Sequence, residues 1–465
     1  MTAPAITPLW TSEEIVTATG GIASAPFVVD GVTFDSREVG PRDLFVALSG
    51  EATDGHRFVE QARERGASGF LVSNDVDAPH VRVADTTAGL TALAVAARAR
   101  THAKIIGVTG SVGKTGVKEA IRLALTRAMP DRVHASVKSY NNHTGVPLSL
   151  ARMPADTRAG VFEMGMNHAG ELAALTRIVR PHIAVVTAIA SAHREFFASE
   201  EAIADAKGEI FAGLEPGGVA IVPFDSPHRD RLIGHARDHA ARIVTFGLGD
   251  GAAVRATAFT LHPDCITATA TIGEHRLMFR VGMAGAHWLS NTLAVLAAVD
   301  AVGGDLALAG LALAELTELA GRGARFTVAR DDGIATVIDE SYNANPASMA
   351  AALGVLGGVV PRGQGRRIAV LGEMRELGTG SDDFHAGLAA AVEAAGVDRA
   401  ILVGDAMAAL ANALPRRITT TRAADATDAF AILDKALAAN DVVLIKGSNS
   451  VGLGSLVARL RKAAA

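Results

Sequence analysis

The stretch GVTGSVGKT at residues 107–115 decides the fold. It continues an apolar, β-branched run at 104–109, and the segment after Lys114 has the apolar spacing of a helix. A strand, a glycine-rich turn and a helix opening on Lys-Thr form a phosphate-binding loop, because glycines let backbone N–H groups converge on phosphate oxygens. Val108 stands where the strict pattern has a glycine, so the loop is a variant. It predicts ATP or GTP as the ligand, with Mg²⁺ at the threonine hydroxyl.

Apolar segments of strand length recur along the chain and alternate with helical segments. Strands are predicted at 104–109, 160–164, 183–189 and 218–224, and in a second series at 336–341, 367–372, 399–404 and 441–447. This alternation is typical of doubly wound α/β sheets. Alternating Thr, Val and Ala at 252–281 predict an antiparallel hairpin insertion, and a helix-rich stretch follows at about 285–320.

The chain is predicted to form three domains, as its 465 residues suggest at roughly 100–200 residues per domain. Residues 1–88, with short strands, turns and one helix at 57–66, form a small N-terminal α/β domain. Residues 89–325 form the central P-loop domain, and 326–465 form a C-terminal, Rossmann-like α/β domain. The glycine-rich GRGAR at 321–325 is the predicted hinge before the last domain.

The composition excludes several classes of protein. Lys and Arg number 44 against 49 Asp and Glu, and the net charge of −5 argues against a polycationic nucleic-acid binder. The single cysteine, Cys265, excludes an internal disulfide and a thiolate zinc site, which fits a reducing cytoplasm. The N-terminus has no signal-peptide pattern, and the uncharged stretches at 281–299 and 341–361 contain polar groups that oppose membrane insertion.

Three polar residues downstream of the loop are candidates for metal chemistry. Glu163 lies at a strand end in FEMGMN, His193 follows the strand at 183–189, and Lys207 lies on a helix in DAKGEIF. A carboxylate at a strand terminus after a P-loop commonly serves the magnesium of the nucleotide. Taken singly, Glu163 is explained equally well as a solvated strand end, whereas His193 is better explained as a surface or satisfied histidine and Lys207 as a helix-face lysine.

Tyrosine and asparagine, both scarce, gather in predicted loops. The two tyrosines, Tyr140 and Tyr342, precede asparagines in SYNNHTG and SYNANP. Seven asparagines follow predicted strands or start a helix: Asn141, Asn142, Asn167, Asn291, Asn343, Asn345 and Asn449. Clustered amides in loops indicate recognition of a polar ligand, whereas asparagine also suits turns and helix caps. Both explanations stay open.

In order and spacing, the motifs of this chain resemble those of the Mur ligase family over nearly its whole length. The motifs are FDSREVGPRDLFVALSGEATDGHRF (34–58), TGSVGKT, SYNNHTGVPLSL, FEMGMNHAGEL, HREFF, AKGEIF, AHWLSNTLAVLAA, DESYNANPASM, LGEMRELG and KGSNS. The resemblance implies an ATP-dependent, Mg²⁺-requiring amide ligase of peptidoglycan precursor synthesis that works through an acyl phosphate. SYNNHTGVPLSL and DESYNANPASM resemble the member that adds a dipeptide. The implied substrates are therefore UDP-N-acetylmuramoyl-tripeptide and D-Ala-D-Ala, and a monomer is expected.

The resemblance also implies roles for the three domains and for individual residues. The N-terminal domain would hold the UDP end, the central domain ATP, and the C-terminal domain the dipeptide. Catalytic and metal-binding roles fall on Lys114, Thr115, Glu163, His193 and Lys207, the last being carbamylated in several members. ATP-binding roles fall on Gly110, Ser111, Val112, Gly113, Lys114, Thr115, Asn291, Arg325 and Asp339. Substrate-binding roles fall on Ser36, Arg37, Asp54, His56, Asn141, Asn142, Tyr342, Asn343, Asn345, Lys446 and Ser448.

The chain departs from the family pattern at three places. Gly116 replaces the usual Ser or Thr after Thr115, Asn449 replaces the arginine of KGSR, and 451–454 lack the usual charged continuation. The alternatives are a different Mur ligase, a folate-glutamate ligase, a P-loop switch ATPase and a non-catalytic nucleotide-sugar binder. A switch ATPase would hydrolyse ATP without an acceptor and would need no nucleotide-sugar module.

Overall fold

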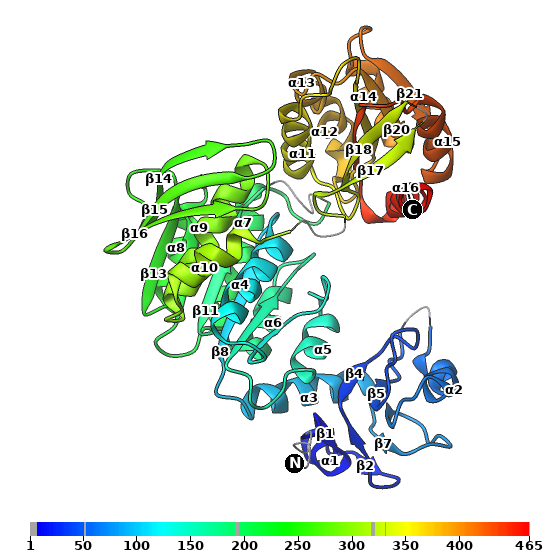
Figure 1. The fold of residues 1–465 in the computed structure, drawn as a ribbon. Coiled ribbons are helices and arrows are strands. Elements are labelled where there is room, and N and C mark those ends of the chain that lie inside the picture. The colour runs from blue at the N-terminus through cyan, green and yellow to red at the C-terminus, as the bar shows by residue number, and fades with distance from the viewer. Residues whose placement is uncertain (1–6, 51–52, 191–194, 318–320, 331, 465) are drawn as a thin grey trace, which may run out of the picture.

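The computed structural model describes residues 7–50, 53–190, 195–317, 321–330 and 332–464, which form three lobes (Figure 1). The N-terminal lobe holds β1 to β7, the central lobe β8 to β16, and the C-terminal lobe β17 to β22. The central lobe lies between the other two, and the chain as a whole is C-shaped (Figure 1). The α/β fold of three parts predicted from the sequence is confirmed.

The N-terminal lobe is built on a five-stranded sheet in the order β2-β7-β6-β5-β4. The strands of this sheet are β2 (Ile22–Ala23), β4 (Gly31–Thr33), β5 (Asp43–Val46), β6 (Gly69–Val72) and β7 (His80–Arg82), while β1 (Trp10–Thr11) pairs with β3 (Val28–Val29). The helices are α1 (Ser12–Thr19), α2 (Val59–Glu64) and α3 (Thr86–Ala99). The helix predicted at 57–66 is the 3₁₀ turn Gly55–Phe58 followed by α2.

The central lobe has a nine-stranded sheet in the order β16-β15-β14-β13-β12-β11-β8-β10-β9. Its strands are β8 (Lys104–Thr109), β9 (Val133–Ala135), β10 (Ala159–Glu163), β11 (Ile183–Val186), β12 (Val219–Pro223), β13 (Arg242–Gly247), β14 (Val254–Leu261), β15 (Ile266–Ile272) and β16 (His275–Val281). The helices are α4 (Lys114–Ala128), α5 (Gly145–Ala151), α6 (Glu171–Val179), α7 (Glu200–Gly208), α8 (Arg229–Arg237), α9 (Ala286–Ala301) and α10 (Leu306–Ala314), with a 3₁₀ turn at Glu209–Gly213. The predicted alternation of strand and helix is confirmed.

The segment predicted as a hairpin insertion at 252–281 is instead three antiparallel strands that continue the central sheet. β14 joins through its parallel pairing with β13, so the segment is no separate insertion. Its alternation explains why, because Ile266, Ala268, Ala270 and Ile272 are buried in one cluster with the residues of α9. The uncharged run at 281–299 therefore belongs to the hydrophobic core of the central lobe.

The C-terminal lobe has a six-stranded sheet in the order β17-β18-β22-β19-β20-β21, with β17 antiparallel to β18. Its strands are β17 (Ala324–Arg330), β18 (Gly333–Glu340), β19 (Arg367–Gly372), β20 (Arg399–Val403), β21 (Thr419–Ala423) and β22 (Val442–Lys446). The helices are α11 (Pro346–Gly358), α12 (Ser381–Gly387), α13 (Ala389–Ala394), α14 (Ala408–Ala413), α15 (Ala426–Ala436) and α16 (Leu453–Ala464), with 3₁₀ turns at Gly378–Gly380, Asp405–Met407 and Asn449–Val451.

The predicted domain boundaries fall just inside elements of the structure. Helix α3 crosses the boundary at 88/89, and β17 crosses the one at 325/326. The division itself stays a prediction. Within the described ranges, no helix combines the length and the apolar character needed to cross a membrane.

Candidate active site

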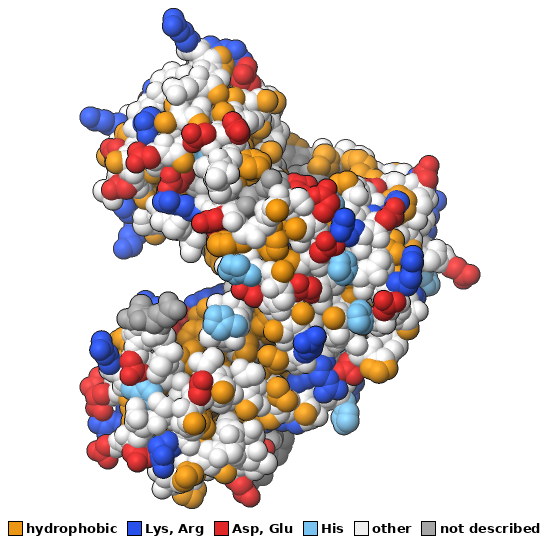
Figure 2. All heavy atoms as spheres, turned by 180° about the vertical axis from the view of Figure 1, so that it is seen from behind, with side chains coloured by type: hydrophobic (Ala, Val, Ile, Leu, Met, Phe, Trp, Pro, Cys, Tyr) orange, Lys and Arg blue, Asp and Glu red, His pale blue; other side chains and the backbone are white. Residues whose placement is uncertain are grey.

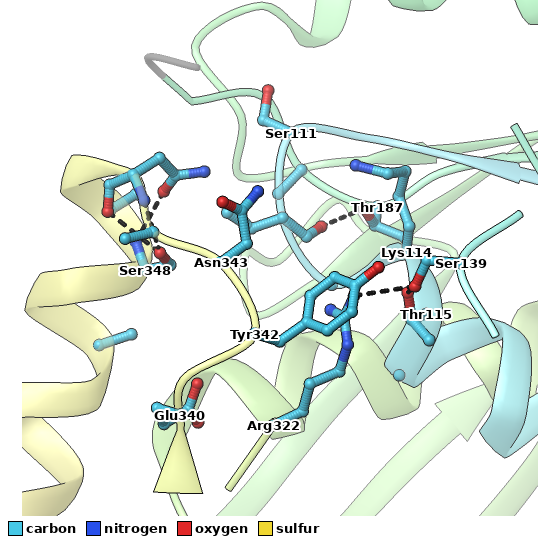
Figure 3. A pocket seen from close by; sticks show the side chains of 18 of the residues that line it. Ser111, Lys114, Thr115, Ser139, Thr187, Arg322, Glu340, Tyr342, Asn343 and Ser348 are labelled. Carbon is cyan, nitrogen blue, oxygen red and sulfur yellow. Dashed lines mark hydrogen bonds between the residues drawn. The ribbon is translucent and has the colours of Figure 1, made fainter. Parts of the chain in front are cut away.

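A cavity of about 790 Å³ lies between the central and C-terminal lobes (Figure 3). Most of the predicted site residues line it, from both lobes: Ser111, Val112, Gly113, Lys114, Thr115, Asn141, Glu163, Asn291, Tyr342, Asn343, Asn345, Lys446 and Ser448. The ends of parallel strands β8, β10 and β11 meet at this place, which is where open α/β sheets bind ligands. The arrangement brings the phosphate-binding loop to face the loops of the C-terminal lobe.

The phosphate-binding loop needs glycine at two positions. Gly110 (φ 150°) and Gly113 (φ 85°) both have backbone angles that side chains rarely adopt. A Cβ on Gly110 would lie 2.0 Å from Thr187 Oγ1, and one on Gly113 would lie 2.7 Å from Asn291 Oδ1. Lys114 Nζ donates to Gly110 O at 2.8 Å, so the lysine is folded back over the loop. Burial lowers the pKa of Lys114, against the opposing effect of nearby Glu163.

Thr115, Asn141 and Glu163 form a buried polar cluster at the base of the cavity. Glu163 is 1% exposed, and its Oε2 accepts from Thr115 Oγ1 at 2.7 Å. Its Oε1 accepts from Asn141 Nδ2 at 2.7 Å. Ser139 Oγ lies 3.2 Å from Thr115 Oγ1 and completes the group. Two donors hold the carboxylate, and the carboxylate and the Thr115 hydroxyl are oxygen groups of the kind that Mg²⁺ prefers.

Lys207 lies beside this cluster without lining the cavity. Its side chain is fully buried on α7, and Nζ has no hydrogen-bond partner in the described structure. Burial places the pKa of Lys207 well below its ordinary value, and the neighbouring Lys114 lowers it further. Burial in this environment disfavours the ammonium form of the side chain. His193 lies outside the described residues.

Arg322, which sequence reasoning did not single out, lies between the two faces of the cavity (Figure 3). Its Nη2 donates to Ser139 Oγ at 3.1 Å, and its guanidinium lies 4.1 Å from the centre of the Tyr342 ring. Arg325, the predicted arginine of the same glycine-rich stretch, does not line this cavity. Its Nη2 donates to Pro263 O at 3.0 Å. The sequence signal that could have identified Arg322 was the stretch GRGAR, which contains both arginines.

Asp339 holds the hinge and does not line the cavity. It is 3% exposed, and its Oδ2 accepts from the Gly321 backbone at 3.0 Å. Its Oδ1 accepts from Ser341 Oγ at 2.6 Å. Both oxygens are occupied by groups of the chain, so the structure gives this residue a part in fixing the turn between the lobes.

The C-terminal face of the cavity combines one buried cation with exposed polar groups. Lys446 is 2% exposed, and its Nζ donates to Asn343 O at 2.8 Å and Glu340 Oε2 at 3.3 Å. Burial lowers the pKa of this lysine. Ser448 Oγ accepts from the Arg375 backbone at 2.9 Å. Lys446 therefore fixes the loop after β18.

The four predicted residues of the N-terminal lobe lie away from this cavity. Ser36 Oγ donates to Gln61 Oε1 at 2.8 Å, whereas the side chain of Arg37 is exposed and pairs with Asp35. That hydrogen bond lowers the pKa of Asp35 to about 2. His56 Nδ1 lies 2.6 Å from Asp54 Oδ1, and the pair forms the 3₁₀ turn before α2.

Two predicted asparagines stabilise the chain at helix starts, Asn142 in the turn before α5 and Asn345 as the N-cap of α11. Asn142 Oδ1 accepts from the Gly145 backbone at 2.8 Å, at the start of α5. Asn345 Oδ1 accepts from the Ser348 backbone at 2.9 Å and forms a capping box at α11. Asn345 also lines the cavity, whereas Asn142 does not. The turn chemistry left open by the sequence is thus present at both positions.

One of the departures from the family pattern has a structural counterpart. A Cβ on Gly116 would lie 2.8 Å from Trp288 Cη2, because the indole ring of α9 packs against the first turn of α4. The glycine therefore makes room for the ring. Asn449 is exposed and lines the cavity at the 3₁₀ turn after β22.

Fold and site together define an enzyme of three lobes that binds a nucleotide through a P-loop. Three family models match the chain one after another. They are the Mur ligase family catalytic domain at 28–108, the Mur ligase middle domain at 108–299, and the Mur ligase glutamate ligase domain at 324–449. The chain belongs to the Mur ligase family, as the motifs predicted, and it is an ATP-dependent ligase.

Individual relatives are similar over almost their whole length. The UDP-N-acetylmuramoyl-tripeptide–D-alanyl-D-alanine ligase of Escherichia coli (strain K12) is 34% identical over 454 residues, which cover 95% of this chain and 96% of that protein. The ligase of the same name from Bacillus subtilis (strain 168) is 32% identical over 440 residues, covering 92% and 93%.

Solved structures of the same kind superpose on all three lobes. MurF from Acinetobacter baumannii has a TM-score of 0.84 at 29% identity and covers 98% of this chain and 99% of its own. MurF ligase from Thermotoga maritima, solved in complex with ADP, has a TM-score of 0.75 at 25% identity and covers 93% and 97%.

Proposed function

We propose that this chain joins D-Ala-D-Ala to UDP-N-acetylmuramoyl-tripeptide, giving UDP-N-acetylmuramoyl-pentapeptide, ADP and phosphate. The observation that carries the proposal is the cavity in which the phosphate-binding loop faces the loops 342–345 and 446–450 of the C-terminal lobe. Such a cavity can hold ATP on one face and an incoming amine on the other. The full-length similarity to ligases named for this reaction supports the same two substrates.

The reaction consists of two transfers. A carboxylate oxygen of the tripeptide attacks the γ-phosphorus of ATP, ADP leaves, and an acyl phosphate forms. The amine nitrogen of D-Ala-D-Ala then attacks the acyl carbon, phosphate leaves, and the nitrogen loses a proton. Both partners of the first transfer are anions, so charge neutralisation is the central requirement. Lys114 and Arg322 supply fixed positive groups on the cavity wall.

The residues at the base of the cavity fit Mg²⁺. Thr115 and Glu163 offer a hydroxyl and a carboxylate, the hard oxygen donors that this ion prefers. Thr115, Glu163 and Lys207 would hold it, together with the predicted His193, which lies outside the described residues. When bound, the ion neutralises charge on the transferred phosphate.

Lys207 suits carbamylation, which would make it an anionic oxygen ligand. Carbon dioxide reacts with a neutral amine, and burial lowers the pKa of Lys207 and so favours that form. Its Nζ has no hydrogen-bond partner among the described residues, as expected of an atom that gains its partners only after modification. Mass spectrometry of the intact chain with and without bicarbonate, beside Lys207→Ala, tests the modification.

We also propose that the lobes close around the substrates at the hinge 321–325. Figure 2 shows a wide gap between the N-terminal and C-terminal lobes, and an acyl phosphate in an open site would be hydrolysed by water. The chain is expected to be a cytoplasmic monomer. X-ray scattering of the protein in solution should therefore give a smaller radius of gyration when ATP and UDP-N-acetylmuramoyl-tripeptide are bound. Identical profiles with and without ligands would refute closure.

The function is tested by phosphate release from ATP with Mg²⁺ and UDP-N-acetylmuramoyl-tripeptide, with and without D-Ala-D-Ala. Release that needs both substrates, with a pentapeptide product by mass, supports the proposal. Release stimulated by a single amino acid, or by glutamate with a folate, would reassign the chain within the ligases. Hydrolysis indifferent to every acceptor would refute ligation.

A further inference from the structure

The loop segment 136–141, which follows β9, contacts both the candidate active site and the N-terminal lobe. Its side chains alternate in direction. Ser139 and Asn141 contact the base of the cavity, whereas Lys138 and Tyr140 contact Glu38 of the N-terminal lobe. This segment therefore connects the candidate active site with the N-terminal lobe.

On the cavity side, the segment supports both of the oxygen groups proposed to hold Mg²⁺. Asn141 Nδ2 donates to Glu163 Oε1 at 2.7 Å, and Ser139 Oγ lies 3.2 Å from Thr115 Oγ1. Arg322 Nη2 donates to the same Ser139 hydroxyl at 3.1 Å. A displacement of the segment would change the surroundings of the carboxylate and the hydroxyl together.

On the other side, Glu38 holds two residues of the segment. Its carboxylate pairs with the Lys138 ammonium and accepts from the Tyr140 hydroxyl at 3.4 Å, while the Tyr140 ring lies 5.7 Å from that of Phe34. Lys138 has a φ of 54°, in the left-handed region that lysine rarely adopts. Besides its pair with Glu38, the Lys138 ammonium lies 5.7 Å from the centre of the Tyr140 ring, and the Lys138 carbonyl accepts from Lys118, so several contacts hold this backbone conformation.

Lys118 anchors the same segment from the helix that starts at the phosphate-binding loop. Its side chain is fully buried, and Nζ donates to Ser136 O at 2.7 Å and to Lys138 O at 3.1 Å. Glu119 Oε1, 2.6 Å away, balances the buried charge. A buried ammonium that is bound to two backbone oxygens fixes the position of the backbone closely.

We propose that Glu38 and Lys118 are positioning residues that hold the segment 136–141 from its two sides, so that docking of the N-terminal lobe sets the geometry of Thr115 and Glu163. Neither Glu38 nor Lys118 lines the cavity, so each acts through the segment. The inference rests on the proposed nucleotide and magnesium site. By this inference the N-terminal lobe, which is predicted to hold the UDP end of the peptide substrate, also contributes to nucleotide binding in the central lobe.

The test measures binding of a fluorescent ATP analogue to the full chain without peptide substrates, with Mg²⁺ and with a chelator. Glu38→Gln removes the charge that pairs with Lys138 but keeps an acceptor for Tyr140, and Glu38→Ala removes both. We expect Mg²⁺-dependent affinity to fall about threefold in Glu38→Gln and about tenfold in Glu38→Ala, the scale of one or two lost charge-assisted hydrogen bonds. Affinity measured with the chelator should not change.

The matched control is Glu60→Gln, in the same lobe. Glu60 pairs with Arg63 on the surface and has no contact with the segment, so nucleotide binding should equal that of the unmodified chain. Lys118→Met should weaken Mg²⁺-dependent binding more than Glu38→Ala. If Lys118→Met does not fold, the two Glu38 variants still decide the question.

Two results would overturn the inference. One is Mg²⁺-dependent binding by Glu38→Ala that equals that of the unmodified chain. The other is an equal loss with Mg²⁺ and with chelator, which would indicate general damage to the fold. Because the measurement contains no acceptor, it does not depend on product formation. A chain that shows the expected losses but makes no pentapeptide would refute the proposed reaction and leave the inference standing.

Discussion

The two faces of the cavity are built differently. On the central face, Lys114, Thr115 and Glu163 are bonded to their own lobe and tightly packed, and glycines at 110 and 113 leave no room for change. On the C-terminal face, Tyr342 is 38% exposed. The comparison shows that the residues of the phosphate-binding loop are held by contacts within the central lobe, whereas Tyr342 and Asn343 of the C-terminal face stay exposed and can contact a ligand.

The largest effect is expected from a substitution on the central face of the cavity. Lys114→Met removes the positive group that would lie at the transferred phosphate, so kcat for pentapeptide formation should fall by about 10³-fold or more. Steady-state kinetics measure this effect, and circular dichroism checks the fold. A variant that keeps kcat within about tenfold of the unmodified chain would show that the loop binds no transferred phosphate.

A smaller effect is expected at the residue that joins the two faces. Arg322→Ala removes the bond to Ser139 and the stacking on Tyr342, so kcat should fall about 10- to 100-fold with a smaller change in the KM for ATP. Arg322→Lys keeps the charge and should recover part of the rate. A loss confined to the KM for ATP would mean that Arg322 only binds the nucleotide.

The packing of the central face is tested at Gly116. In Gly116→Ser, the new Cβ would lie 2.8 Å from the Trp288 ring, so the free energy of unfolding should fall by about 1–3 kcal/mol. Combining it with Trp288→Leu makes room and should recover part of this loss, as denaturant titration can measure. Additive losses in the double variant would contradict the contact.

The smallest effect is a pH dependence of stability beneath the same face. Burial lowers the pKa of His134 to about 4, while its Nε2 donates to Ser149 O at 2.7 Å. As the pH falls, the unfolded chain therefore protonates this imidazole at a higher pH than the folded chain does. The stabilisation is complete above about pH 6.5 and is lost toward pH 4, at a cost of about 2–3 kcal/mol. His134→Gln should flatten the unfolding free energy over this range, and parallel curves would refute the prediction.

The sequence predicted the fold well because its signals are local. The strand, turn and helix around Lys114 follow from apolar spacing and glycine alone, and four strands of each of these two sheets follow from apolar runs, whereas β9, β13 and β21 were not predicted. The third strand of the antiparallel extension, His275–Val281, was not predicted separately, although Leu277, Phe279 and Val281 alternate with exposed Arg276, Met278 and Arg280. β17 was missed because the glycines before it resemble a hinge.

The candidate site was only partly predictable for a different reason. Roles that depend on which way a side chain points cannot be read from the chain alone. Arg322 and Arg325 lie three residues apart, yet only Arg322 lines the main cavity. Asn141 and Asn142 are adjacent, yet the first contacts Glu163 and the second accepts from the Gly145 backbone in the turn before α5. The catalytic and binding roles of the predicted residues themselves stay predictions.

The extension of the central sheet also bears on how the molecule avoids self-association. β16 is the last strand on its side of the nine-stranded sheet, and no strand among the described residues pairs with its outer backbone groups. Exposed edges of this kind pair readily with strands of other molecules. Arg276 and Arg280 are exposed along β16, and their like charges would repel a second copy aligned edge to edge. Arg280 also pairs with Asp264 at 3.7 Å, so Arg276 carries most of the unpaired charge beside Met278, which is 81% exposed.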